Sequence, residues 1–287
     1  MFSCLLLLGS LSTAHAADTV PVLCYDNVVE DYHLFLNGRD PLELDSYAGP
    51  KSRRDVIEIV ILQQALARGG FKKPITLSTE PGMSYKRTMQ LMQSGDYLAI
   101  CTSNWLKPIL DIDGVKPSSI VIPSEKFIAG LFTGEDRVDE IKISSVEDAR
   151  RYKILCNTNW IQDQQTIDAM QLNCVETRGW ETMVRMLADR RGDFMLAPFQ
   201  SRPDGALEAY DLRFKPIPGV KVRLDDDRTY MVSMMHPDGA AFYAALNKGL
   251  DLLRAENRLE QAYTESGFYN QSVKDWTLLN PAEPKSD

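Results

Sequence analysis

Residues 152–197 have the sequence YKILCNTNWIQDQQTIDAMQLNCVETRGWETMVRMLADRRGDFMLA, in which short apolar runs alternate with segments of mixed polarity. Short apolar runs are typical of buried strands, and apolar residues at helical spacing are typical of amphipathic helices. We expect strands at 152–156, 173–176 and 193–197 and helices at 163–170 and 180–190. Strands separated by helices indicate a sheet with parallel strands and helices on its faces, so this stretch is predicted to be an α/β unit.

The region before this stretch has the same alternation. We expect strands at 20–25, 75–78 and 97–101, helices at 52–68 and 85–93, and polar turns over 26–50. The pattern restarts with a strand at 127–132, and after a strand at 230–234 two helices, 239–256 and 259–266, precede a polar tail, 280–287. A chain of 287 residues with 44% hydrophobic residues is long enough for two cores. The predicted fold class is therefore α/β with two lobes.

The first 16 residues are interpreted as a signal peptide. Met1–Ala16 has no charged residue, an apolar run at 5–8 and the small-residue ending Ala14-His15-Ala16. The usual basic start is missing, and a buried N-terminal helix is the alternative. The apolar run is too short to span a membrane. We expect a soluble protein exported to the periplasm.

Four cysteines remain after the signal segment: Cys24, Cys101, Cys156 and Cys174. Four cysteines allow three disulfide connectivities. If the strands that carry them are neighbours, Cys24–Cys101 and Cys156–Cys174 are the pairings to test, and buried free thiols are the alternative. No C-x-x-C motif or neighbouring histidine accompanies them, so we expect no metal and no cofactor.

The formal charge of −8 argues against a nucleic-acid partner, because an acidic surface repels phosphates. Each basic pair, at 53–54, 150–151 and 190–191, has acidic neighbours. Only His33 and His236 follow the signal segment, and G-x-S-x-G, H-E-x-x-H and phosphate-binding glycine motifs are absent. A binding protein is therefore favoured over an enzyme, although a pair of catalytic carboxylates stays open.

Three segments carry a resemblance to a known family. ISSVEDA (143–149) precedes the strand YKILC, RGDFML (191–196) follows a helix, and FYAALNKGLDLLRAENRLEQAYTESGF (242–268) lies near the end of the chain. Their order and spacing resemble the polar-amino-acid type (family 3) of bacterial periplasmic solute-binding proteins, over nearly all of the chain after the signal segment.

The resemblance implies a two-lobed periplasmic-binding-protein-like fold in which each lobe is a mainly parallel sheet flanked by helices. Lobe one would comprise residues 18–125 and 227–287, and lobe two residues 126–226. Hinges would lie near 123–125 and 226–228. A monomer would bind a small polar molecule between the lobes, and the ligand would favour the closed state.

Ligands of open α/β sheets bind beyond the carboxyl ends of the strands. The hydroxyl, amide, amine and aromatic side chains that follow the expected strands are therefore candidate ligand-binding residues, with helix capping or loop packing as the alternative. They are Tyr25, Thr102, Ser103, Asn104, Trp105, Lys107, Asn159, Trp160 and Phe199.

The sequence departs from the family pattern at both ends of an amino-acid ligand. The resemblance implies an arginine shortly after the third strand, where Lys107 is the nearest cation, and an acid after a later strand of lobe two, where Phe199 stands. Asp163 or Asp26 could substitute for the acid. The resemblance implies an ABC permease as partner; an orphan module that reports to a membrane sensor, or a dehydratase-like lyase on the same scaffold, are the alternatives.

Overall fold

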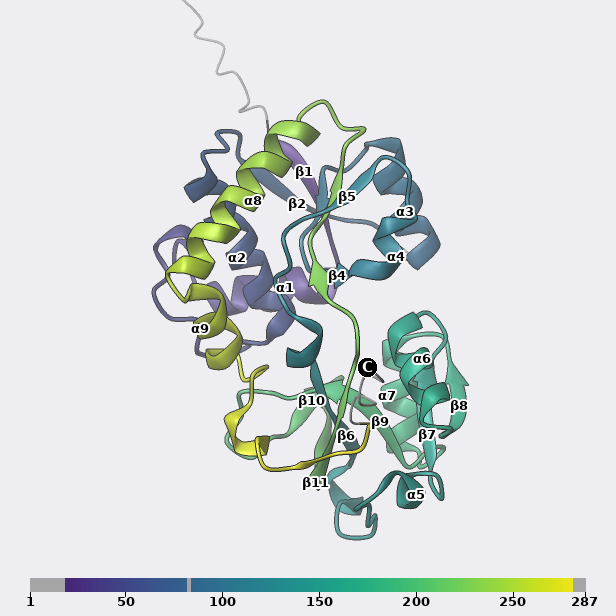
Figure 1. The fold of residues 1–287 in the computed structure, drawn as a ribbon. Helices are drawn as coiled ribbons and strands as arrows, with labels where there is room; N and C mark the ends of the chain where they lie inside the picture. The colour runs from purple at the N-terminus through teal and green to yellow at the C-terminus, as the bar shows by residue number, and fades with distance from the viewer. Residues whose placement is uncertain (1–18, 82–83, 281–287) are drawn as a thin grey trace, which may run out of the picture.

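The computed structural model describes residues 19–81 and 84–280, and the expected signal segment 1–16 and residues 281–287 lie outside this range. The chain has the expected two-lobed α/β fold (Figure 1). Each lobe is built around one sheet. A small two-stranded pair is formed by β4 (Asn104–Trp105), which precedes the second lobe in sequence, and β12 (Arg228–Thr229), which follows it. No helix within the described ranges is long and apolar enough to cross a bilayer.

The sheet of the first lobe has the strand order β2-β1-β3-β13-β5. The strands β2, β1 and β3 are parallel, and β13 is antiparallel to both of its neighbours, β3 and β5. The bounds are β1 (Val20–Cys24), β2 (Ile75–Thr79), β3 (Ala99–Ile100), β5 (Val115–Pro117) and β13 (Met231–Ser233).

Helices α2 (Arg54–Gly69) and α8 (Gly239–Ala255) pack closely against each other in the first lobe. A Cβ atom at Gly249 would lie 1.8 Å from the backbone oxygen of Ala65, and one at Gly69 would lie 1.8 Å from that of Ala245. Only glycine permits this approach of the two backbones. The contact joins the N-terminal part of the chain to the part that follows the second lobe.

The expected polar turns over 26–50 are wrong for the first part of that range. Residues Asp26–Leu36 form helix α1, with Val28, Tyr32, Phe35 and Leu36 buried. These four positions have helical spacing and therefore form one apolar face. The remaining helices have the bounds α3 (Tyr85–Ser94), α4 (Leu106–Leu110), α5 (Val146–Ala149), α6 (Ile161–Ala169), α7 (Trp180–Ala188) and α9 (Arg258–Glu265).

The sheet of the second lobe has the order β10-β11-β6-β9-β7-β8, and β14 pairs with β11. Parallel pairing holds for β7 with β8 and β9, while β6 is antiparallel to β9 and β11. The bounds are β6 (Ile128–Gly134), β7 (Lys153–Asn157), β8 (Asn173–Thr177), β9 (Phe194–Pro198), β10 (Leu207–Ala209), β11 (Leu212–Arg223) and β14 (Thr277–Leu278).

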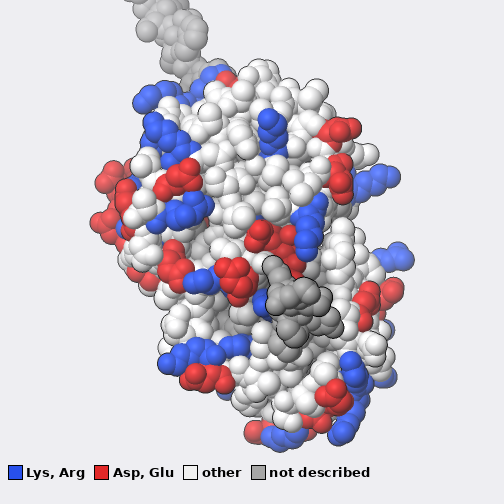
Figure 2. All heavy atoms as spheres, in the orientation of Figure 1, with Lys and Arg blue, Asp and Glu red and all other residues white. Residues whose placement is uncertain are grey.

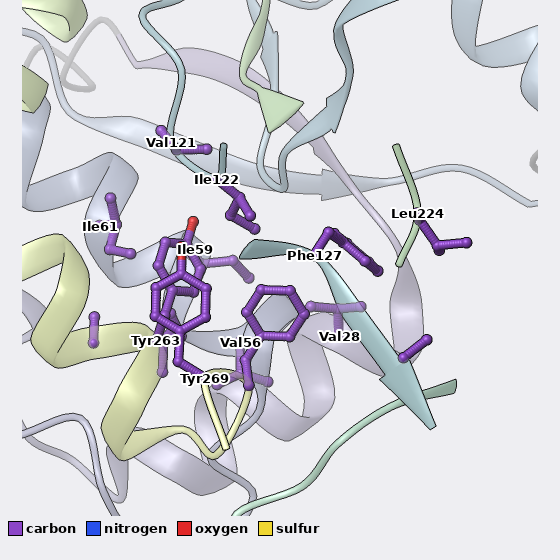
Figure 3. Close-up of a cluster of buried hydrophobic side chains, with 14 of the residues drawn as sticks. Val28, Val56, Ile59, Ile61, Val121, Ile122, Phe127, Leu224, Tyr263 and Tyr269 are labelled. Carbon is purple, nitrogen blue, oxygen red and sulfur yellow. The ribbon is translucent and has the colours of Figure 1, made fainter. Parts of the chain in front are cut away.

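Two antiparallel crossover segments join the lobes. The amide of Arg228 donates to the carbonyl of Ile122 at 2.8 Å, and the amide of Ser124 donates to the carboxylate of Asp227 at 2.8 Å. These segments contain the residues predicted as hinges, and their movement stays a prediction. One continuous hydrophobic core includes residues of both lobes and of these segments. Figure 3 shows some of its members from α2, the crossovers and α9: Val56, Ile59, Phe127, Leu224 and Tyr263.

The end of the described chain makes a third connection between the lobes. After α9, β14 pairs with β11, the Lys221 ammonium donates to two carbonyls of the segment at 2.7 Å, and Trp276 packs on Phe199 at 5.7 Å between ring centroids. The sequence assignment of 227–287 to lobe one therefore differs from the structure at 273–280. A two-residue strand leaves no periodicity that would have indicated its partner sheet.

Both disulfide pairings that the strand pattern suggested are present in the structure. Cys24–Cys101 joins the ends of β1 and β3 with a Cα–Cα distance of 5.4 Å, and Cys156–Cys174 joins β7 and β8 at 5.9 Å. Cys24 and Cys101 directly precede Tyr25 and Thr102. The Cys24–Cys101 disulfide therefore fixes the two strand ends that lead into the predicted site residues Tyr25 and Thr102.

We predict that loss of the two disulfides has unequal effects on stability. Loop-closure entropy gives about 4.5 kcal/mol for the bond that spans 77 residues and about 3 kcal/mol for the one that spans 18. Cys24→Ala with Cys101→Ala should therefore lower the free energy of unfolding in urea more than Cys156→Ala with Cys174→Ala. A larger loss for the second pair would contradict this order.

Candidate functional site

Charged side chains from both lobes gather where the lobes meet. We name this group the interlobe charge cluster: Arg54, Asp55, Glu58 and Arg228 of the first lobe and Asp163 of the second. Figure 2 shows a waist between the two lobes, with acidic and basic side chains close together on its upper side. The following contacts define what the cluster can bind.

Glu58 is the anchor of the cluster. Its side chain is 0% exposed and lies in the second turn of α2. The backbone amide of Ser103 donates to it at 2.8 Å, the Ser103 hydroxyl at 2.6 Å and the Tyr263 hydroxyl at 3.3 Å, and Arg54 Nη1 lies 3.3 Å away. A buried carboxylate needs such donors, since an unpaired charge is costly to bury. Glu58 thereby fixes the loop after β3 to α2 and α9.

Arg228 lies above Trp105 and is held by the same serine. Its Nε donates to the Ser103 hydroxyl at 2.9 Å, and its guanidinium also donates to the Ser103 carbonyl. The guanidinium carbon lies 4.4 Å from the centroid of the Trp105 ring and 5.4 Å from that of Phe127, which favours cation–π attraction. Burial, and then the charge of Arg54, lower its pKa to about 10, so Arg228 remains a cation at neutral pH.

Arg54 and Asp55 form the part of the cluster at the start of α2, and their side chains are only 14% and 27% exposed. Arg54 pairs with Asp55, which also accepts a hydrogen bond from Arg53 at 2.6 Å. Burial alone would raise the pKa of Asp55, but the charges of Arg54, Arg53 and Arg228 outweigh it and lower that pKa. Within the described residues, Arg54 Nε is buried without a hydrogen-bond partner. Two neighbouring guanidiniums with an unused donor are suited to an anionic group.

Asp163 faces this cluster from the first turn of α6 in the second lobe. It lines a small pocket with Asn157, Trp160 and Met183. Burial raises the pKa of Asp163 to about 7, and the charges of Arg228 and Arg54 offset part of this rise. Both protonation states of Asp163 are therefore populated at neutral pH.

Several sequence-predicted residues lie at the cluster. Tyr25 is 38% exposed at the end of β1, and desolvation raises the pKa of its hydroxyl while the Arg228 charge lowers it in part. The Trp105 ring packs against the Arg228 guanidinium. Trp160 packs on Trp180 with 6.0 Å between ring centroids, and it lines the same pocket as Asp163. These three aromatic side chains and Ser103, which bonds to Glu58 and Arg228, are the predicted residues that the structure brings next to the charged groups.

The other predicted residues have structural contacts. Thr102 and Ser103 are buried, the Asn104 amide donates to the Thr102 carbonyl, and Phe199 is buried against Phe132 and Trp276. The Lys107 ammonium donates to the carbonyl of Asp225 at 3.0 Å and so holds a crossover segment.

Asn159 is exposed, and its amide approaches the carbonyl of Arg178 at 3.4 Å. Asp26 is also exposed, so of the two acids suggested as substitutes only Asp163 belongs to the cluster.

Sequence reasoning missed Arg54, Asp55, Glu58 and Arg228. Arg54 was noted only as part of a basic pair among acidic residues, and Arg228 follows three aspartates. A glutamate in the middle of an apolar helix was the one available signal, because α2 buries Glu58 among Ile57, Ile59 and Ile61. Across the described part of the chain, no three His, Cys, Asp or Glu side chains converge to hold a metal ion.

Comparison with known proteins shows similarity in structure only. No family model matches the chain, and no curated protein matches it in sequence. The probable amino-acid ABC transporter extracellular-binding protein YtmK of Bacillus subtilis has a TM-score of 0.55 at 10% identity, covering 86% of this chain and 97% of its own. The GluR0 ligand-binding core in complex with L-glutamate has a TM-score of 0.54 at 11% identity, covering 88% and 100%.

A third solved structure is an ancestral amino-acid-binding protein, described as a precursor of cyclohexadienyl dehydratase. It has a TM-score of 0.50 at 11% identity and covers 86% of this chain and 94% of its own. These neighbours are two-lobed periplasmic-binding-protein folds, which confirms the fold class expected from the sequence.

We predict that Glu58→Gln is strongly destabilising. The variant leaves Arg54 and Arg228 buried without their central carboxylate, and removing one partner from a buried ion pair costs about 3–5 kcal/mol. Glu256→Gln is the matched control, because its pair with Arg68 is on the surface and is worth less than about 1 kcal/mol. Equal losses in urea unfolding would show that Glu58 does not anchor the cluster.

Proposed function

We propose that this protein is an exported solute-binding protein that captures a small carboxylate-bearing molecule between its lobes by hinge closure. The observation that carries the proposal is the pair of buried guanidiniums, Arg54 and Arg228, at the junction of the lobes. Like charges held together in a protein repel each other, and an anion between them relieves that repulsion. The ligand carboxylate would therefore lie at Arg228 and Arg54.

Aromatic side chains would provide the apolar part of the binding surface. Trp105 and Tyr25 lie beside Arg228 in the first lobe, and Trp160 lies beside Asp163 in the second. Small-molecule sites combine a few charged groups with such aromatic surfaces. From the predicted set we retain Tyr25, Trp105 and Trp160, and we leave out Ser103, Lys107 and Phe199, whose side chains support the protein itself.

The solved structures that resemble this chain favour binding and transport over catalysis. One is named as a probable ABC transporter binding protein and another as a ligand-binding core with L-glutamate. We therefore propose a periplasmic location, an amino-acid-like ligand and an ABC permease as partner. A membrane sensor is the alternative partner, and a lyase activity is the alternative function that the precursor of cyclohexadienyl dehydratase suggests.

A thermal-shift screen of amino acids, small organic acids and polyamines tests the proposal. A ligand at one hundred times its Kd stabilises the folded protein by about 2.7 kcal/mol and so raises Tm. The proposal predicts hits that carry a carboxylate. No shift with any compound would contradict it, and conversion of a hit followed by NMR would indicate an enzyme.

Arg228→Gln should weaken binding of every hit at least about thirtyfold, because it removes a buried charged partner. Arg185→Gln, at an exposed position of α7 paired with Glu181, should leave binding unchanged. Trp105→Ala is the second variant, and circular dichroism checks that each variant is folded. If Arg228→Gln and Trp105→Ala both bind like the wild type in titration calorimetry, the ligand lies elsewhere.

A further inference from the structure

We propose that residues 266–280, which we name the strap, hold the two lobes in one arrangement in the ligand-free protein. The strap follows α9 of the first lobe and includes β14, which pairs with β11 of the second. The inference rests on the hinge movement of the proposed function, but it is tested without a ligand. It assigns the strap the task of restraining the movement that the two crossover segments would permit.

Helix α9 fixes the start of the strap to the first lobe. The backbone amide of Tyr47 donates to the Glu265 carboxylate at 2.5 Å, and the Ser46 hydroxyl donates to the same carboxylate at 2.9 Å. At the other end of α9, the Arg258 guanidinium donates to the carbonyl of Leu44. These partners all lie in the segment that precedes α2. The strap therefore leaves the first lobe at a fixed point directly after Glu265.

The far end of the strap is fixed to the second lobe at β11. Beyond the pairing of β14, the amide of Leu279 donates to the carbonyl of Lys221 at 2.9 Å. The Asn280 side chain accepts from the backbone amide of Arg223 at 2.9 Å and donates to the carbonyl of the same residue at 2.8 Å. Arg223 is the last residue of β11 and directly precedes the second crossover segment. The strap is therefore anchored in both lobes.

Between its anchored ends the strap lies against the loop that follows β9 in the second lobe. Gly267 has a φ of +77°, and a Cβ atom there would lie 2.2 Å from the backbone nitrogen of Ser201, so only glycine permits this approach. The Asn270 amide approaches the carbonyl of Gln200 at 3.4 Å. The Ser201 hydroxyl approaches the carbonyl of Ser52 in the first lobe at 3.4 Å. The loop therefore contacts the strap and the first lobe at the same residue.

Aromatic side chains join the strap to the first crossover segment. Phe268 is buried, and its ring lies 5.0 Å from that of Phe127 between centroids. The Lys126 ammonium lies 4.9 Å from the centroid of the Tyr269 ring, and Figure 3 shows Tyr269 and Phe127 in one buried cluster. The strap therefore packs against the first crossover at its beginning and against the second crossover at Asn280.

These contacts restrain the lobes because they join parts that a hinge movement would shift. Two crossover segments alone let the lobes rotate through small changes in backbone dihedral angles. Such a rotation changes the position of β11 relative to α9, and the strap is bonded to both. It also moves the loop after β9 relative to Gly267, where the two backbones touch. Other arrangements of the lobes are therefore less populated while the strap is attached.

A purely structural role for the strap makes a different prediction. A segment that only covers the edge of β11 would stabilise the second lobe, and its loss would lower Tm without changing the distance between the lobes. The interlobe distance in the free protein therefore separates the two roles, whereas a Tm measurement alone does not.

Double electron–electron resonance between two nitroxide labels measures this distance. Leu110→Cys on α4 and Gln165→Cys on α6 place one label on an exposed position of each lobe. A Cys4→Ser background removes the one native cysteine outside the two disulfides. Hydrogen exchange of the strap amides, followed by mass spectrometry, reports whether the strap stays attached. With the strap intact, we expect one narrow distance distribution.

Two variants loosen the strap through different contacts. Lys221→Met with Asn280→Ala removes the side-chain hydrogen bonds at its far end, and Trp276→Ala removes its ring contact with Phe199. Each should speed exchange of the strap amides and add a second distance that carries at least about a tenth of the molecules. Lys215→Met is the matched control, because Lys215 lies on the same strand but pairs with an acid of its own lobe, and it should keep the single distance.

An unchanged distance in both variants, with faster exchange of the strap, would overturn the inference and leave the strap as a cover for β11. Two distances in the protein with an intact strap would also overturn it. Strap amides that stay protected in both variants would do the same, because the contacts named above would then not hold the strap. These outcomes leave the proposed function in place, since the ligand screen decides it separately.

Discussion

The buried carboxylate of Glu58 is the interaction on which the region between the lobes depends. It receives donors from the loop after β3, from the start of α2 and from α9, and the Ser103 hydroxyl that donates to it also accepts from Arg228. The positions of Trp105 and Arg228 therefore follow from one fully buried group. Such a network specifies one arrangement strongly, because each unsatisfied member would carry the full penalty of burial.

The same region combines this polar network with packed aromatic side chains where the chain passes from the first lobe to the second. Phe127 lies at the start of the second lobe, 4.7 Å from Trp105 and 5.0 Å from Phe268 between ring centroids. Apolar contacts are not directional, so these rings can shift against one another with little loss, whereas the hydrogen bonds of Ser103 cannot. Motion between the lobes would thus be accommodated by the aromatic side chains while the charged groups of the first lobe keep their geometry.

The sequence predicted the order of strands and helices well where each element carries its own periodicity, as in 152–197. The sequence did not indicate a strand at β11, because Pro216 and Pro218 disfavour one. The register of β11 with β6 indeed shifts between Pro216 and Lys221. Sequence reasoning also failed for the charged groups of the site. Arg54 and Arg228 belong to α2 and β12, and no local pattern shows that the fold brings them together. Strand-end reasoning found the aromatic side chains because their place follows from local sequence.

The connection made by β14 has a consequence for the order in which the protein is assembled. The chain is made, and would be exported, from its N-terminus, so the segment that forms β6 to β11 emerges before Thr277 and Leu278. Until Thr277 and Leu278 are present, Val220 and Lys221 of β11 lack their β14 partner, and the ring of Phe199 is not covered by Trp276. A chain that stops before Thr277 would keep every strand of the first lobe's sheet but expose an unpaired edge of β11 in the second, and such an edge favours pairing with another chain.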